Sequence, residues 1–242
     1  MTTKKHATQD PADYIMPLNM NGLQGRMLYL PPYGKSKEIL FIYGHHSTIE
    51  RWWGLIQELN KFGAVTVPDL PGFGGMENLY KIGERPTIDR YAAYLAAFIK
   101  LRYKRRRLTI VGVGFGLVVA TRMLQRYPDI AKKVDLVVSL AALAHYDDFG
   151  LRPKQRKRYC AITYMLGMSL PAAVLRHTYL RPPTIRRAYA ARKSYMKYRR
   201  LEASVFKVPN SLSIELWRQC DVRTHMATLS AMLAVDNCQT RL

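Results

Sequence analysis

Short apolar runs alternate with segments of helical periodicity along the first 144 residues of the chain. Apolar runs at residues 39–43, 64–67, 108–111 and 134–140 predict strands. The run at 39–43 ends in a glycine and is typical of a strand buried on both faces. Apolar positions at helical spacing predict helices over residues 52–59, over 88–99 and up to residue 124. This alternation predicts an α/β fold, with a mainly parallel sheet flanked by helices.

The same patterns suggest how the chain is divided. A further strand near residues 26–30 is expected to pair antiparallel at the sheet edge. After residue 144 strand signals cease, and two helices are expected near residues 160–170 and 185–198. The predicted organisation is a polar leader (1–24), an α/β core (25–144), a basic helical cap inserted after the core (145–225) and a C-terminal tail (226–242). A core ending at the strand of residues 134–140 leaves that strand with a free edge, which predicts a homo-oligomer.

Charge is concentrated in the predicted cap. The chain has a formal net charge of +21, and residues 151–207 hold fifteen basic side chains against one acid, Glu202. Interleaved with tyrosines, these charges suit nucleic acid or an anionic membrane surface, and Arg186, Arg187, Arg199 and Arg200 are the proposed contacts. A solvated basic surface without a partner is the simpler alternative, because no phosphate-binding loop or RNA-binding signature accompanies the charge.

Other classes of protein are disfavoured by local features. The chain has no run of 18 apolar residues, and its N-terminus has no apolar stretch behind the lysines, so neither a membrane span nor a signal peptide is predicted. Three scattered cysteines favour reduced thiols and a cytoplasmic location. The spacing of Cys220, His225 and Cys238 matches no structural zinc pattern, so no metal or other cofactor is expected.

Three turns that follow predicted strands carry recognisable motifs. The first strand ends in Tyr43-Gly-His-His46, the second in Asp69-Leu-Pro-Gly-Phe-Gly74 and the third in Gly112-Val-Gly-Phe-Gly116. In this order, and followed by a helical insertion, the motifs resemble those of cap-containing serine hydrolases of the α/β-hydrolase superfamily over roughly residues 25–225. That resemblance implies hydrolysis of an ester or a related acyl bond, and a small hydrophobic acyl ligand.

The third motif has the form of the nucleophile elbow, G-x-S-x-G. A sharp turn from strand to helix projects one side chain and needs small residues two positions away on both sides, a need that Gly112 and Gly116 meet. By the resemblance, the backbone N–H groups of His45 and Phe115 would form the oxyanion hole. These donors do not depend on their side chains.

The catalytic side chains themselves are not recognisable. Gly114 stands at the nucleophile position and offers no oxygen or sulfur. An acid after the fourth strand is conceivable at Asp147 or Asp148, with His225 as a base, but the match is weak. The chain is therefore predicted to be a catalytically impaired or truncated member of the superfamily. A non-enzymatic module that binds anionic polymers or membranes is the alternative.

Two sharper readings of these motifs are less favoured. Dinucleotide binding would need the third glycine one residue later, where Leu117 stands, and an acid at the end of the following strand. His45 and His46 could serve in catalysis or metal binding, but side chains that simply line the loop are the preferred interpretation.

Overall fold

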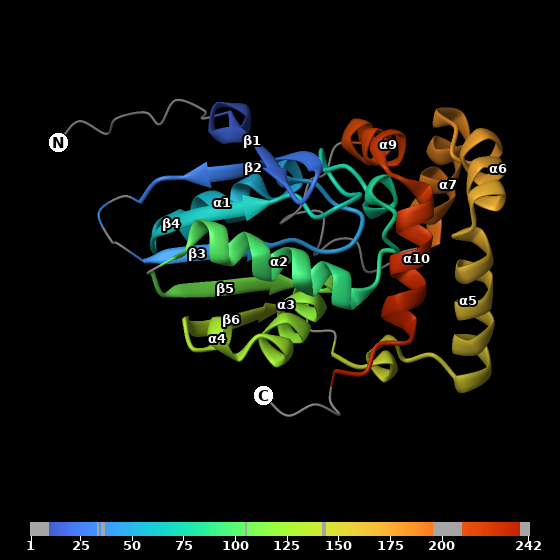
Figure 1. Cartoon of the computed structure of the whole chain (residues 1–242). Coiled ribbons are helices and arrows are strands. Elements are labelled where there is room, and N and C mark those ends of the chain that lie inside the picture. The colour runs from blue at the N-terminus through green and yellow to red at the C-terminus, as the bar shows by residue number, and fades with distance from the viewer. Residues whose placement is uncertain are drawn as a thin grey trace.

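A six-stranded mixed sheet forms the centre of the molecule (Figure 1). The computed structural model describes residues 10–32, 34, 37–104, 106–141, 144–195 and 210–237. Its strands are β1 (Ile15–Met20), β2 (Leu23–Leu30), β3 (Glu38–Ile42), β4 (Ala64–Pro68), β5 (Leu108–Val113) and β6 (Val134–Leu140). Their order is β1-β2-β4-β3-β5-β6; β1, β2 and β4 pair antiparallel, and the remaining neighbours pair parallel. The predicted fold class is confirmed.

The sheet begins earlier than the sequence pattern predicted. Residues Ile15–Met20, placed in the polar leader, form the edge strand β1, and β2 lies inside it rather than at the edge. The apolar signal in β1 is weak because only Leu18 and Met20 are buried on it. Pro17 is tolerated in this strand, as proline usually is at sheet edges.

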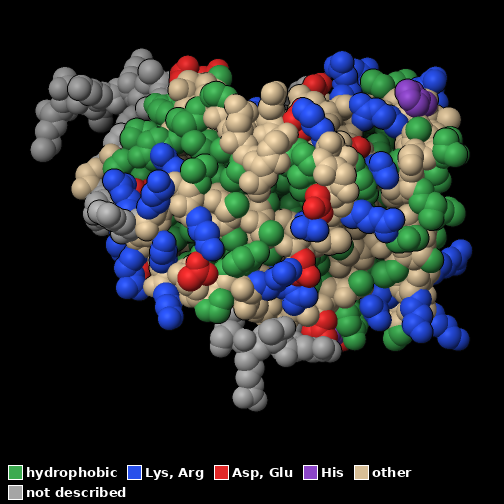
Figure 2. All heavy atoms as spheres, viewed as in Figure 1, with side chains coloured by type: hydrophobic (Ala, Val, Ile, Leu, Met, Phe, Trp, Pro, Cys, Tyr) green, Lys and Arg blue, Asp and Glu red, His purple; other side chains and the backbone are tan. Residues whose placement is uncertain are grey.

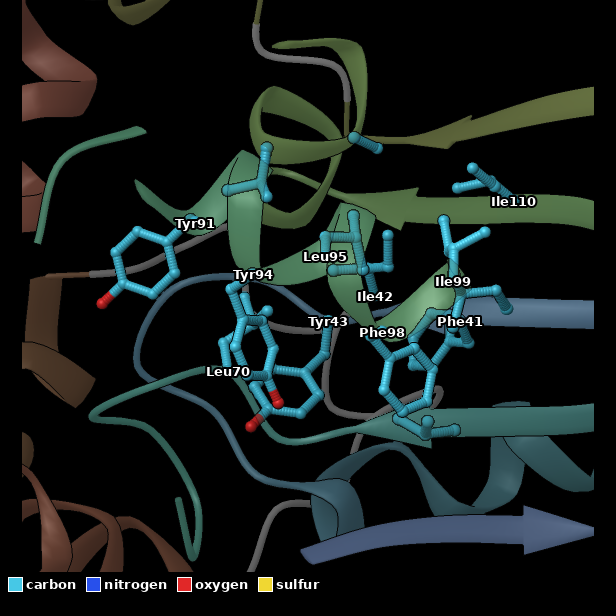
Figure 3. Close-up of a cluster of buried hydrophobic side chains, with 14 of the residues drawn as sticks. Phe41, Ile42, Tyr43, Leu70, Tyr91, Tyr94, Leu95, Phe98, Ile99 and Ile110 are labelled. Carbon is cyan, nitrogen blue, oxygen red and sulfur yellow. The ribbon is translucent and has the colours of Figure 1, made fainter. Parts of the chain in front are cut away.

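Helices and 3-10 turns join the strands of the core. They are η1 (Pro11–Tyr14), η2 (Ile49–Trp52), α1 (Trp53–Asn60), η3 (Leu79–Ile82), α2 (Ile88–Arg102), α3 (Phe115–Arg126) and α4 (Pro128–Ala131). Figure 1 shows α2 lying across the near face of the sheet, and it packs against α3. Its apolar side chains meet those of β3 in the cluster drawn in Figure 3, where Phe98 and Ile99 lie near Phe41.

The remaining described elements are helical and gather beyond the carboxyl ends of the parallel strands (Figure 1). They are η4 (Tyr146–Phe149), α5 (Pro153–Leu166), α6 (Ser169–Thr178), α7 (Pro182–Tyr195), α9 (Asn210–Gln219) and α10 (Val222–Leu233). Helix α10 packs against α5 and α6. It thus lies between the outer helices and the sheet.

The predicted C-terminal tail is part of this packed assembly. Most of α10 falls in the range 226–242, and Met232, Leu233 and Val235 are buried. The side-chain amide of Asn237 donates to the carbonyl of Val118 at 3.1 Å. The chain is therefore docked on α3 up to the last described residue.

Candidate functional site

The turn between β5 and α3 has the geometry of a nucleophile elbow. Gly114 has φ +48° and ψ −110°, a conformation that residues with side chains rarely adopt. A Cβ built on Gly114 would have no atom within 4 Å, so a side chain here would project into open space. The position is shaped to present a side chain, and glycine supplies none.

The two flanking glycines are needed for close packing. A Cβ on Gly112 would lie 2.8 Å from the Cα of Leu117, and one on Gly116 would clash with the carbonyl oxygens of Ile42 and Tyr43. Both contacts are with backbone that cannot easily move. The predicted need for small residues at positions 112 and 116 is therefore explained by contacts in the structure.

The loop after β3 lies beside this elbow, because β3 and β5 are parallel neighbours. A Cβ on Gly44 would lie 3.2 Å from the carbonyl oxygen of Val113. His45 follows directly, and its ring centroid is 5.9 Å from that of Phe115. Within the described residues, neither His45 nor Phe115 donates its backbone N–H to another backbone group. This placement suits the predicted pair of oxyanion donors.

The Asp69–Gly74 loop is held by a buried charge network that the sequence did not reveal. Asp69 is 0% exposed and accepts hydrogen bonds from Tyr43 Oη at 2.6 Å and Gly75 N at 2.7 Å. Arg26 Nε lies 2.6 Å from the same carboxylate, and its two terminal nitrogens donate hydrogen bonds to the carboxylate oxygens of Glu50. Burial raises the pKa of the Tyr43 hydroxyl well above its usual value, so it remains a donor.

The side chain of His45 connects the elbow region to α10. Its Nε2 lies 2.9 Å from Thr228 Oγ1 and 3.2 Å from the carbonyl oxygen of His225. Because a carbonyl can only accept, Nε2 carries the proton and donates. Phe73 of the neighbouring loop packs edge-on to the same ring at 5.4 Å. His45 therefore fixes the position of its own backbone.

Three histidine rings meet at this point. The ring centroid of His225 lies 4.3 Å from that of His45 and 4.9 Å from that of His46, and Trp217 stacks near His46 at 4.1 Å. Burial lowers the pKa of His45 to about 4. Burial, with the neighbouring His45, lowers the pKa of His46 to about 4 and that of His225 well below its usual value. All three imidazoles are thus neutral at pH 7.

The weakly predicted acids have local roles. The carboxylate of Asp148 accepts from the backbone N–H groups of Ala144 and His145, and Asp147 lies 3.3 Å from the ring of His145. Both acids are exposed, and none of their contacts among the described residues joins them to His225. They do not complete a triad with it here.

Only two of the four arginines predicted to contact a polyanion lie among the residues that the structure describes. Arg186 and Arg187 lie on α7 and are exposed, whereas Arg199, Arg200 and Cys238 lie outside the described residues. Figure 2 shows Lys and Arg side chains alternating with hydrophobic ones over the outer helices.

Sequence reasoning missed several residues that build the site. Arg26, Thr228 and Trp217 come from segments far apart along the chain, and no local pattern links them to the elbow. The carboxylate of Glu50 pairs with Arg26, which lies 24 residues earlier in the chain. A buried ion-pair partner has no signature in sequence spacing.

Comparison with known proteins agrees with the geometry. No family model matches the chain. A haloalkane dehalogenase from Mesorhizobium japonicum is 24% identical over 144 residues, which is 58% of this chain and 44% of that protein. The crystal structure of an N-formylmaleamic acid deformylase from Pseudomonas putida S16 aligns with TM-score 0.55 and 15% identity over 92% of this chain and 75% of that one. The chain has the α/β-hydrolase fold.

The resemblance inferred from the three motifs is thereby confirmed at the level of the α/β-hydrolase fold. A thermophilic esterase from Thermogutta terrifontis also matches, with TM-score 0.55 and 15% identity over 92% of this chain and 72% of that one. The match to the dehalogenase spans less than half of that relative's length. Among the described residues of this α/β-hydrolase-fold chain, no helix is both long and apolar enough to traverse a lipid bilayer.

Proposed function

We propose that this α/β-hydrolase-fold chain binds a small carboxylate or acyl ligand at the elbow and does not form an acyl-enzyme. The observation that carries the proposal is Gly114, which has the positive-φ backbone conformation of a nucleophile position and open space where a side chain would project. Acyl transfer needs an oxygen, sulfur or carboxylate nucleophile there. Glycine has none, whatever the state of its neighbours.

What remains at the site favours an anionic or carbonyl oxygen. The N-terminus of α3 directs backbone N–H groups and a partial positive charge outward. The backbone of His45 lies beside it, held by the side-chain contacts to α10. Preorganised donors of this kind bind a carboxylate oxygen as they would bind an oxyanion.

Equilibrium binding to substitutions of Gly114 tests the proposal. Asparagine and aspartate both tolerate positive φ and have the same shape, so G114N and G114D form a matched pair that differs by one charge. Titration calorimetry with straight-chain carboxylic acids of increasing length should show binding to the unmodified chain. The affinity of G114D should be at least about tenfold below that of G114N, equivalent to about 1.4 kcal/mol.

Two results would contradict the proposal. One is no binding of any acid in the series by the unmodified chain. The other is equal affinity in G114N and G114D, which would place the ligand away from the elbow.

A second function rests on the outer helices. Large apolar side chains are exposed on α5 and α6, including Tyr164, Leu170 (80% exposed) and Val174. They alternate with exposed basic residues such as Lys157 and Arg158 (Figure 2). Apolar anchors among basic charges favour an anionic membrane surface over a purely polar polyanion. We propose surface binding as the alternative or additional activity.

A further inference from the structure

His46, Cys220 and His225 meet in space although they come from three segments. His46 lies in the loop after β3, Cys220 links α9 to α10, and His225 lies in the first turns of α10. One potential ligand atom from each side chain lies within 4.8 Å of the other two. Sequence spacing could not indicate this group, because His46 is far from the other two along the chain.

Two members of the group are buried, His46 is partly buried, and one ring nitrogen of each histidine lacks a partner among the described residues. Cys220 is 6% exposed and His225 is 7% exposed. Within the described part of the chain, neither Nε2 of His46 nor Nδ1 of His225 has a hydrogen-bond partner. Leaving such an atom buried and unsatisfied costs about 1–3 kcal/mol. Two of them side by side next to a thiol point to a missing common partner.

A small cavity lies beside two of the three side chains, His46 and Cys220. This cavity of about 10 Å³ is lined by His46, Cys220, Gln219 and residues of the loops after β3 and β4. A cavity of this size holds about one water molecule. An organic ligand does not fit in it, whereas a single ion does.

The donor types select the ion. Two imidazoles and a thiol, with no carboxylate among them, suit a borderline-soft ion such as zinc and disfavour magnesium and calcium. We propose that His46, Cys220 and His225 bind one zinc ion, with water as the fourth ligand. With Zn–N and Zn–S bonds of about 2.0–2.3 Å, tetrahedral ligand atoms lie roughly 3.3–3.6 Å apart. The side chains therefore need to close by about an ångström.

Such an ion would join α10 and the segment between α9 and α10 to the loop after β3. The loop after β4 already approaches α10 closely, since a Cβ on Gly72 would lie 2.5 Å from a side-chain carbon of Thr224. Through His46, zinc would add a link between α10 and the loop after β3. A metal that binds only the folded state raises the free energy of unfolding by RT ln(1 + c/Kd), where c is the free metal concentration, so stability rises with the logarithm of the metal concentration above Kd.

Cobalt and zinc titrations test the proposal on the reduced, chelator-treated chain. Co²⁺ should produce a thiolate-to-metal band in the near ultraviolet and visible bands of tetrahedral cobalt, and one equivalent of Zn²⁺ should displace them. The fluorescence of Trp217, which stacks on His46, should change at the same equivalence point. Native mass spectrometry of the unmodified chain should show one zinc retained.

Substitutions then locate the ion. C220S should abolish the thiolate band, and H225N should weaken zinc binding by at least about 10–100-fold. C160S, at a half-buried thiol on α5, and H177N, at an exposed histidine on α6, are the matched controls and should bind as the unmodified chain does. Loss of zinc on chelation should lower the melting temperature of the unmodified chain and leave that of C220S unchanged.

The proposal is overturned if the unmodified chain retains no zinc and shows no cobalt band. It is also overturned if the band persists in C220S but is lost in C160S, because the ion would then occupy another site. Both outcomes are independent of whether the elbow binds a carboxylate.

Discussion

The hydroxyl of Tyr43 donates a 2.6 Å hydrogen bond to Asp69, a carboxylate with no exposed surface. Arg26 completes the pairing from β2 at 2.6 Å. We expect R26M to lower the free energy of unfolding by about 3–5 kcal/mol, because it leaves a buried carboxylate without its counter-charge. Y43F should cost less, about 1–3 kcal/mol.

Urea denaturation measures both effects. K61A is the control, because Lys61 and Glu58 form an exposed pair and its loss should cost less than about 1 kcal/mol. Equal losses in R26M and K61A would show that the buried network does not stabilise the loop.

Stability should fall on acidification because folding lowers the pKa of His45, His46 and His225. The pKa of His45 is lowered to about 4 in the folded state, below its ordinary value near 6.5. The unfolded chain therefore binds more protons between about pH 6.5 and pH 4, and the free energy of unfolding should decrease as pH falls through that window.

Each excluded proton contributes a slope of up to about 1.4 kcal/mol per pH unit. In chelator, H45Q keeps an N–H donor but does not titrate, so its slope between pH 5 and 6 should be smaller than that of the unmodified chain by about that amount. The free energy of unfolding is measured by urea denaturation at each pH. Identical slopes in the unmodified chain and H45Q would mean that folding does not lower the pKa of His45.

The sequence predicted the central sheet well and its limits poorly. Strands β3, β4 and β5 are visible as apolar runs because nearly every residue in them is buried. Strand β6 is also an apolar run, but none of its residues is buried. Strand β1 has only two buried residues and no such signal. The elbow was predictable because its glycine spacing is a local motif, although the carbonyl oxygens that require Gly116 belong to Ile42 and Tyr43, which are distant along the chain. The contacts of His46 with Cys220 and His225 depend on how α9 and α10 dock, which local patterns do not encode.

The free edge of β6 should promote self-association. Strand β6 ends the described sheet, and Leu136 on it is 55% exposed. Exposed apolar edges pair with other chains, and a lysine placed on an edge opposes this. We expect dimers or larger species in light scattering, and a shift toward monomer in L136K.

The control for this experiment is F62K, at an exposed apolar residue after α1 and away from the edge. A monomeric unmodified chain, or equal effects of L136K and F62K, would show that the edge does not associate.

Binding to anionic vesicles should depend steeply on salt if the outer helices contact a membrane. The charge contribution is about 1 kcal/mol per basic residue near an anionic surface and is screened by salt. The double substitution R186Q/R187Q should weaken cosedimentation with phosphatidylserine vesicles, and L170S should weaken it at every salt concentration.

Neutral vesicles are the control. Binding of heparin with no binding of anionic vesicles would indicate a polymer rather than a membrane. Binding unaffected by L170S would show that Leu170 does not contribute an apolar contact with the membrane.

Intact mass after incubation with a reactive fluorophosphonate tests the central claim most directly. Because Gly114 offers no nucleophile, the unmodified chain should gain no stoichiometric adduct, even if it shows weak turnover from oxyanion stabilisation alone. G114S should also label poorly, because a serine without an activating base is a weak nucleophile at neutral pH. A stoichiometric adduct on the unmodified chain, abolished by one substitution such as C160S or S139A, would contradict the account.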